Sequence, residues 1–174
     1  MALLVIACSV SAQAELEHYN IDIKGQHAFV QFKIKHLGYS WLLGDFRKFD
    51  GKFSYDAKQP ERSSVQVEID TRSLDSNHAE RDKHLKSADF LDIKRYPTAS
   101  FKSTNVVKKA DGSLAIHGDL SLRGVTKSIV IDAIEIGRGP DPWMGFRAGF
   151  EGKVMLTLAD FNMTKDLGPA SAQL

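Results

Sequence analysis

Side chains able to transfer protons or bind metals are concentrated in one segment, NHAERDKHLKSADFLDIKRYP, residues 77–97. His78, Glu80, Asp82 and His84 follow one another there at every second position. Imidazole and carboxylate groups serve as general acids and bases and as zinc ligands, so two kinds of chemistry have to be considered. The local structure that carries these side chains decides whether either is feasible.

The composition of this segment predicts a short helix. The segment is rich in Ala, Lys, Glu, Asp and Leu, and Asn77 can cap a helix from His78 to Ser87. Pro97 then restarts an extended chain. Residues six apart on a helix are separated by about 600°, so His78 and His84 do not share a face.

The pairs that share a helical face are His78 with Asp82 and Glu80 with His84, each one imidazole and one carboxylate. A catalytic zinc usually has three protein ligands. The sequence also contains no serine nucleophile elbow and no glycine-rich phosphate loop. We therefore predict no catalytic and no metal-binding residues, and expect these side chains to cap the helical segment and fix it to the rest of the fold.

Length and charge exclude several classes of protein. The 174 residues are enough for one domain with one core. Lys and Arg number 23 against 22 Asp and Glu, and basic residues alternate with acidic ones. A nucleic-acid surface would need a basic stripe, so nucleic acid is not an expected partner.

The first residues, MALLVIACSVSAQA, carry no charge and end in the small-x-small sequence Ala12-Gln13-Ala14. They predict a secretory signal peptide over residues 1–14, without the usual positive first section, and a mature domain over residues 15–174. In a different interpretation, VIAC is a lipobox and Cys8 carries lipid. Cys8 is the only cysteine, so a chain cleaved after Ala14 has no disulfide and no thiolate nucleophile.

In most of the remaining chain, apolar and polar residues alternate at every second position. Val65, Val67 and Ile69, for example, alternate with polar residues. Such alternation predicts strands within residues 27–36, 49–55, 63–73, 98–107, 113–124, 127–136 and 146–158. Breaks such as ADGS and LRGVTK predict hairpin turns between them.

Many half-buried strands and one short helix predict an all-β fold, because so small a helix cannot cover the apolar faces. Sequential strands with short turns favour an antiparallel up-and-down barrel, which at about eight strands has room for side chains or one small ligand. Small residues also occupy inward positions, among them Ala28, Gly51, Ala99, Gly118, Ala148 and Gly152. They either leave room for a ligand or relieve the coiling of strands, and both explanations stay open.

Four segments together resemble the YceI family of exported bacterial proteins: HAFVQFKIKHLGYSWLLGDFRKFDGKFSYD, NHAERDKHLKSADFLDIKRYP, GDLSLRGVTKSIVI and DFNMTKDLGPAS. The resemblance covers nearly all of the mature chain. It implies a lipocalin-like antiparallel barrel with one short helical excursion. Members of the family continue after DLGPAS with an apolar strand that helps to close the barrel. Because this sequence stops at Leu174, either it is a fragment or the protein lacks the closing strand.

The resemblance also implies a function. Members of the family hold a long apolar chain, a polyisoprenoid or an isoprenoid quinone, in the barrel lumen. The expected protein is a periplasmic lipid-binding or carrier protein, not an enzyme, with the bound lipid as ligand and no cofactor. Transient membrane contact and a homodimer are compatible with such a carrier.

The candidate ligand-binding residues are inward-phased apolar side chains and two residues near strand ends: Val30, Phe32, Ile34, His36, Trp41, Phe53, Phe101, Leu120, Leu122 and Phe150. Alternation directs His36 toward the apolar face, where it either bonds a ligand head group or is a satisfied core histidine. Trp41, like Tyr39 and Trp143, lies in a loop-like stretch, and these aromatic residues either line a mouth or cover the barrel end. The loop GPDPWMG is either a lid or a surface turn.

Two other functions share part of this pattern. An outer-membrane barrel shows the same alternation with its apolar face outward. The helical segment, the densely charged opposite faces and the lack of clear aromatic girdles argue against it. A lipid-modifying enzyme would need paired polar groups inside the lumen, and His36 is the strong inward candidate.

Overall fold

The computed structural model describes residues 16–25, 27–36 and 38–165, so the expected signal peptide and the end of the chain lie outside the described residues. The strands are β1 (Glu17–Asn20), β2 (Gln31–His36), β3 (Ser40–Phe46), β4 (Phe49–Tyr55), β5 (Ser64–Asp70), β6 (Leu74–Asp75), β7 (Thr98–Lys108), β8 (Leu114–Leu122), β9 (Val125–Pro140) and β10 (Phe146–Lys153). One α-helix, α1 (Ala79–Leu85), and three 3₁₀ turns, η1 (Pro60–Arg62), η2 (Thr71–Ser73) and η3 (Leu158–Phe161), complete the described elements.

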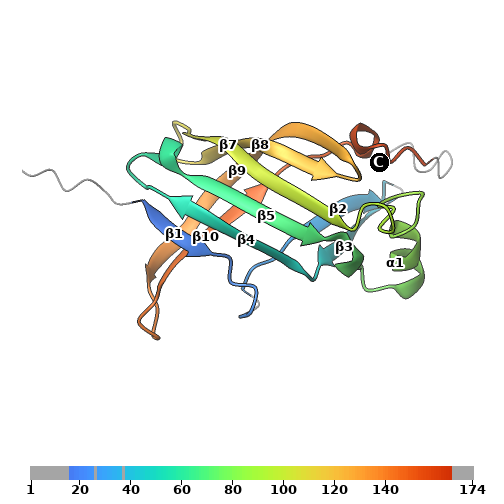
Figure 1. Cartoon of the computed structure of the whole chain (residues 1–174), viewed down its shortest axis with the longest axis horizontal. Coiled ribbons are helices and arrows are strands. Elements are labelled where there is room, and N and C mark those ends of the chain that lie inside the picture. Colours follow the sequence, from blue (N-terminus) through green and yellow to red (C-terminus); the bar gives the residue numbers. More distant parts are fainter. Residues whose placement is uncertain (1–15, 26, 37, 166–174) are drawn as a thin grey trace, which may run out of the picture.

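The strands form an antiparallel, nearly closed barrel, which confirms the predicted fold class. One sheet has seven strands in the order β1-β4-β5-β7-β8-β9-β10, and from β4 onward this order follows the sequence. The hairpin β2–β3 and the short β6 form a second, three-stranded sheet. In Figure 1, β9 and β10 pass behind β4 and β5, and β2, β3 and α1 lie toward the same end of the molecule.

Contacts between opposite ends of the long sheet show that it curls onto itself. The ring of Phe150 on β10 lies 5.7 Å from that of Phe53 and 4.9 Å from that of Tyr55, both on β4. The Tyr55 hydroxyl also donates to the Glu135 carboxylate on β9, at 2.9 Å. β4 and β10 are separated by four strands in the sheet order, so only a strongly curved sheet brings these side chains together.

The predicted alternation is confirmed where one face of a strand is covered. In β5, Val65, Val67 and Ile69 are half-buried, and Gln66 and Glu68 are exposed. β4 has the predicted bounds, β7 and β8 lie within a residue or two of the predicted strands, and β5 ends at Asp70, three residues before the predicted end, where η2 begins.

Several predicted elements are wrong in detail. β2 begins at Gln31, four residues after the predicted start, and β9 extends from Val125 to Pro140, beyond the predicted 127–136. β10 ends at Lys153, and the chain that was expected to continue as a strand to residue 158 turns into η3, which directs Leu158 and Phe161 onto the core. His78, not Asn77, is the N-cap of α1, because the His78 ring nitrogen accepts a hydrogen bond from the Arg81 amide. Asn77 has a φ of 62° just before the cap.

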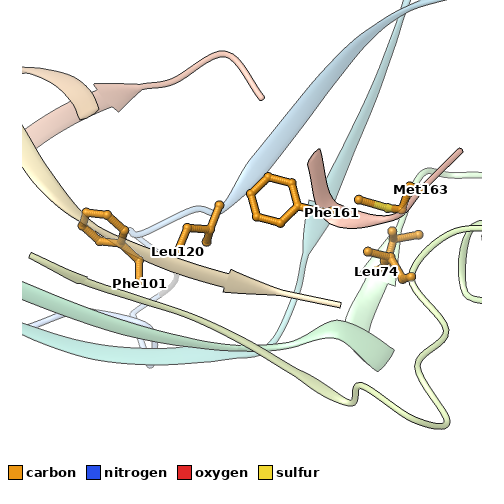
Figure 2. Packing of buried hydrophobic residues seen from close by; sticks show 6 residues of the cluster. Leu74, Phe101, Leu120, Phe161 and Met163 are labelled. Atoms are coloured by element: carbon orange, nitrogen blue, oxygen red, sulfur yellow. The ribbon is translucent and has the colours of Figure 1, made fainter. Parts of the chain in front are cut away.

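Two clusters of buried apolar side chains lie inside the barrel. The first contains Leu74, Leu91, Phe101, Leu120, Phe161 and Met163. Figure 2 shows Phe101 and Leu120 on one side of this cluster and Phe161, Met163 and Leu74 on the other. The second contains Tyr55, Val106, Leu114 and Ala133, and Phe53 and Phe150 pack against it. Ile116 packs against both, so the inner face is continuous between them.

The glycines of the inner face accommodate rings from the protein itself. A Cβ on Gly118 would lie 2.5 Å from the Phe101 ring and 2.5 Å from the Lys102 carbonyl oxygen. A Cβ on Gly44 would collide with the ring of Phe32, which lies across the neighbouring strand. The Phe101 ring occupies the space beside Gly118, so at this position the small residue leaves no room for a ligand.

Candidate functional site

In the structure, the candidate catalytic side chains of residues 77–97 do not converge on one site, and each contacts different neighbours. Asp82 accepts hydrogen bonds from the Ser76 amide (2.8 Å) and hydroxyl (2.5 Å), and Arg81 donates to the same hydroxyl at 2.8 Å. His84 faces the Asp89 carboxylate at 3.3 Å and packs edge-on against Phe90. These contacts tie α1 to the chain on either side of it.

No three His, Cys, Asp or Glu side chains come close enough to hold a metal ion within the described part of the chain. Glu80 is exposed. The contacts of His78, Asp82 and His84 are those that a capping and fixing role requires.

Arg123 attaches this helical segment to the barrel. The residue lies in the β8–β9 turn with a φ of 49°, and its guanidinium donates to the carbonyl oxygens of Ala88 (2.7 Å) and Asn162. One side chain thus joins the β8–β9 turn, the chain after α1 and the chain after η3. With Leu74 and Leu91 packed beneath, the segment covers one end of the barrel.

Six of the ten candidate ligand-binding residues pack into the two inner clusters, and Val30 and Ile34 are half-buried. Phe101 and Leu120 are buried, and the half-buried ones are Val30, Phe32, Ile34, Phe53, Leu122 and Phe150. Phe32, Phe101, Leu120 and Leu122 meet in the first cluster, and Phe53 and Phe150 meet at the second. The six candidates in these clusters therefore form one inner surface drawn from five strands.

His36 and Trp41 lie elsewhere. His36 is exposed at the end of β2, opposite Ser40, so it is not a core histidine. Trp41 was expected in a loop, but it belongs to β3 and points outward with 58% of its surface exposed. Tyr39 and Trp143 do lie in turns, and both are exposed.

The inner face remains partly open to solvent. Apolar side chains that pack against the first cluster but stay half-buried include Val65, Ile116, Leu122, Val125, Ile129 and Ile131. Side chains in a close-packed protein core are fully enclosed by their neighbours. Half-buried apolar groups on a concave inner face therefore present accessible apolar surface, which an apolar molecule would cover.

A polar network that sequence reasoning missed lies beside the second cluster. The Tyr19 hydroxyl donates to Glu17 at 2.7 Å, and the Tyr55 hydroxyl donates to Glu135 at 2.9 Å. Arg138 lies within 3.5 Å of the Glu17 carboxylate and 3.4 Å of that of Glu135. Only the inward phase of Glu135, on the same face as Ala133, could have indicated the network in advance.

Burial and the neighbouring carboxylates fix the protonation state of both tyrosines. Burial, followed by the hydrogen bond to Glu135, raises the pKa of Tyr55 to about 12. Burial and the hydrogen bond to Glu17 raise the pKa of Tyr19 to about 12 as well. Both phenols stay protonated near neutral pH, and the network joins β1, β4 and β9 next to the stacked rings of Tyr19 and Phe53.

The groove on the outer face of β4 and β5 has a different character. Lys48, Asp50, Lys52 and Glu68 line it, so charges of both signs alternate along its length. Such a surface offers little to a long apolar molecule. Within the described residues, no helix is long and apolar enough to cross a membrane.

The geometry defines a class of protein: an antiparallel, nearly closed β-barrel with a partly accessible apolar inner face, a helical segment over one end, and an aromatic and polar network between β1, β4 and β9. Residues 19–173 match the sequence model of the YceI-like domain. The chain belongs to the YceI-like family, as its sequence motifs predicted.

Known relatives cover most of the chain. It is 58% identical over 170 residues to a UPF0312 protein of Ectopseudomonas mendocina, a match that covers 98% of this chain and 89% of the relative. It is 57% identical over 156 residues to protein YceI of Escherichia coli O17:K52:H18, covering 90% of this chain and 81% of that protein. The YceI protein of Campylobacter jejuni, known from a crystal structure, superposes with a TM-score of 0.66 at 30% identity over 83% of each chain.

Proposed function

We propose that this protein binds a long apolar isoprenoid lipid, a polyisoprenoid or an isoprenoid quinone, against the inner face of its barrel and carries it in the periplasm. The observation that carries the proposal is the accessible apolar surface of the interior, to which Ile116, Ile129 and Ile131 contribute. Membership in the YceI-like family supports the same function, because binding of such lipids is what the family resemblance implies.

Apolar contact alone is sufficient for such binding. Each buried methylene contributes about 0.8 kcal/mol, and an isoprenoid chain brings many of them. Part of this gain is lost because the flexible lipid becomes ordered. Selectivity should therefore follow the length and width of the lipid more than its hydrogen-bonding groups.

The inward polar groups favour binding over catalysis. Tyr19, Tyr55, Glu17 and Glu135 are engaged with one another and with Arg138, and both phenols are protonated. A general base has to be free to take a proton near the operating pH. This arrangement supports a role for the network in closing the barrel.

Extraction of the protein purified from the periplasm tests the proposal. Organic extraction followed by mass spectrometry should recover one long isoprenoid lipid in a near-stoichiometric amount. Recovery of mixed membrane phospholipids alone, in the proportions of the surrounding membrane, would contradict specific binding. A lipid that is chemically altered during incubation would favour the enzyme.

A further inference from the structure

The outer face of the β2–β3 hairpin carries large apolar side chains that no other described element covers. In the register of the hairpin, Lys35 pairs with Trp41 and Lys33 with Leu43, so these four side chains share one face. Phe32 and Ile34 point to the opposite, inner face. We refer to these four residues, together with the exposed Tyr39 of the connecting turn, as the hairpin face: Lys33, Lys35, Tyr39, Trp41 and Leu43.

These side chains are far more exposed than their type usually is. Trp41 is 58% exposed, Leu43 64% and Tyr39 91%. Single apolar residues on a surface are ordinary, but neighbouring ones of this size mark a surface that contacts something. Trp41 and Leu43 are two positions apart on one strand and therefore adjacent on its outer face.

The charge on the hairpin face indicates what it contacts. The Lys33 ammonium lies 4.2 Å from the centre of the Trp41 ring, and Lys35 is opposite Trp41 in the register. Asp45 lies at the far end of the hairpin, where it accepts a hydrogen bond from Gln31 and faces Arg47 at 3.7 Å. The part of the face around Trp41 is therefore cationic as well as aromatic.

Trp, Tyr and Lys side chains together suit the boundary between water and lipid. Their rings and aliphatic stems lie among the acyl chains, while the polar ends stay at the level of the head groups. We propose that the hairpin face docks this protein on the surface of an anionic lipid bilayer. This contact is separate from the lipid held inside the barrel, because the two use opposite faces of β2.

The two tryptophans of the chain allow a matched fluorescence test. Trp41 lies on the hairpin face, whereas Trp143 is 74% exposed in the β9–β10 turn, beside Arg147. Trp143→Phe leaves Trp41 as the reporter, and Trp41→Phe leaves Trp143. Each full-length mature variant is mixed with phosphatidylcholine vesicles and with phosphatidylcholine–phosphatidylglycerol vesicles.

The emission of Trp41 should shift to the blue with the phosphatidylglycerol vesicles, and added salt should reverse the shift. The emission maximum of Trp143 should not shift with either kind of vesicle. A shift confined to Trp143, or no shift of Trp41 with anionic vesicles, would overturn the proposal. So would a Trp41 shift that appears without vesicles as the protein concentration rises, because it would assign the face to a second copy of the chain.

Charge substitutions test the cationic contribution. Changing Lys33 and Lys35 together to Gln should weaken partitioning onto the anionic vesicles roughly 25-fold, about fivefold for each charge near a lipid surface. The matched control changes Lys52 and Lys102, exposed lysines on the outer faces of β4 and β7, to Gln. Equal losses in both double variants would overturn the proposal, and retention of the internal lipid, assayed by extraction, reports separately on the proposed function.

Discussion

Substitutions at Leu120 and Ile129 distinguish a filled core from a lipid-binding surface. Leu120 is only 9% exposed and belongs to the first buried cluster. Ile129 packs against the same cluster but stays half-buried on the inner face of β9. If the inner face binds lipid, the two residues should differ in whether truncation destabilises the lipid-free protein or weakens lipid binding.

The expected sizes of the two effects follow from how deeply each side chain is buried. Leu120→Ala should cost about 2–5 kcal/mol of folding free energy in the lipid-free protein, as buried Leu→Ala changes do. Ile129→Ala removes three carbons that are only partly enclosed, so it should lower the folding free energy of the lipid-free protein by less than Leu120→Ala does. Those carbons should instead contact the lipid, and their loss should weaken binding by up to about 2 kcal/mol, at ~0.8 kcal/mol per methylene, or roughly 30-fold.

The assay needs the protein before and after removal of lipid. Urea denaturation of the delipidated variants gives the folding free energies, and titration with the extracted lipid gives relative affinities. Val130→Ala, at the next position along β9 but 43% exposed on the outer face, is the matched control and should change neither quantity much. Equal destabilisation by Ile129→Ala and Leu120→Ala, with unchanged lipid affinity in Ile129→Ala, would show that side chains alone fill the interior.

Three further predictions test contacts that stabilise the fold. Gly118→Ala should cost about 1–3 kcal/mol of folding free energy, because its Cβ would meet the Phe101 ring and the Lys102 carbonyl; Gly137→Ala, with nothing within 4 Å of its Cβ, is the control in the same urea titration. The raised pKa of Tyr55 contributes stability below pH 10.0 that is lost as the pH rises toward about 12, so Tyr55→Phe should flatten that decline in thermal melts at alkaline pH, and an unchanged decline would count against the buried network. His84→Ala should lower the melting temperature and leave the extracted lipid unchanged, whereas stoichiometric zinc retained by the wild type and lost in this variant would contradict a structural role.

The sequence predicted the strands wherever one face of a strand is covered by other side chains and the other face is exposed to solvent. β5 is the clear case, because Val65, Val67 and Ile69 alternate strictly with polar residues. The rule fails at β3, where Trp41, Leu42 and Leu43 are consecutive and apolar on both faces, so no period of two is visible. An exposed apolar face on a strand removes the very contrast on which the prediction depends.

Other parts of the site depend on contacts that local patterns do not contain. The polar network joins β1, β4 and β9, and Tyr55 meets Glu135 only because the long sheet curls by a particular amount. Phe161 was missed for a related reason: the alternation through residue 158 concealed the change from strand to η3. The inner apolar residues, in contrast, were found from phase alone, since phase fixes which way a side chain points whatever its final neighbours.

The alternation of β2 keeps the two proposed activities separable. Phe32 and Ile34 contribute to the inner face, and Lys33 and Lys35 contribute to the hairpin face, so one strand of the barrel separates the two surfaces. A carrier that exchanges an insoluble lipid has to bring its interior close to a membrane, and a docking surface one strand away from the interior meets that need. Because the side chains at alternate positions have different neighbours, substitutions on one face should leave the other nearly unchanged, and their effects on membrane partitioning and on lipid retention should combine additively.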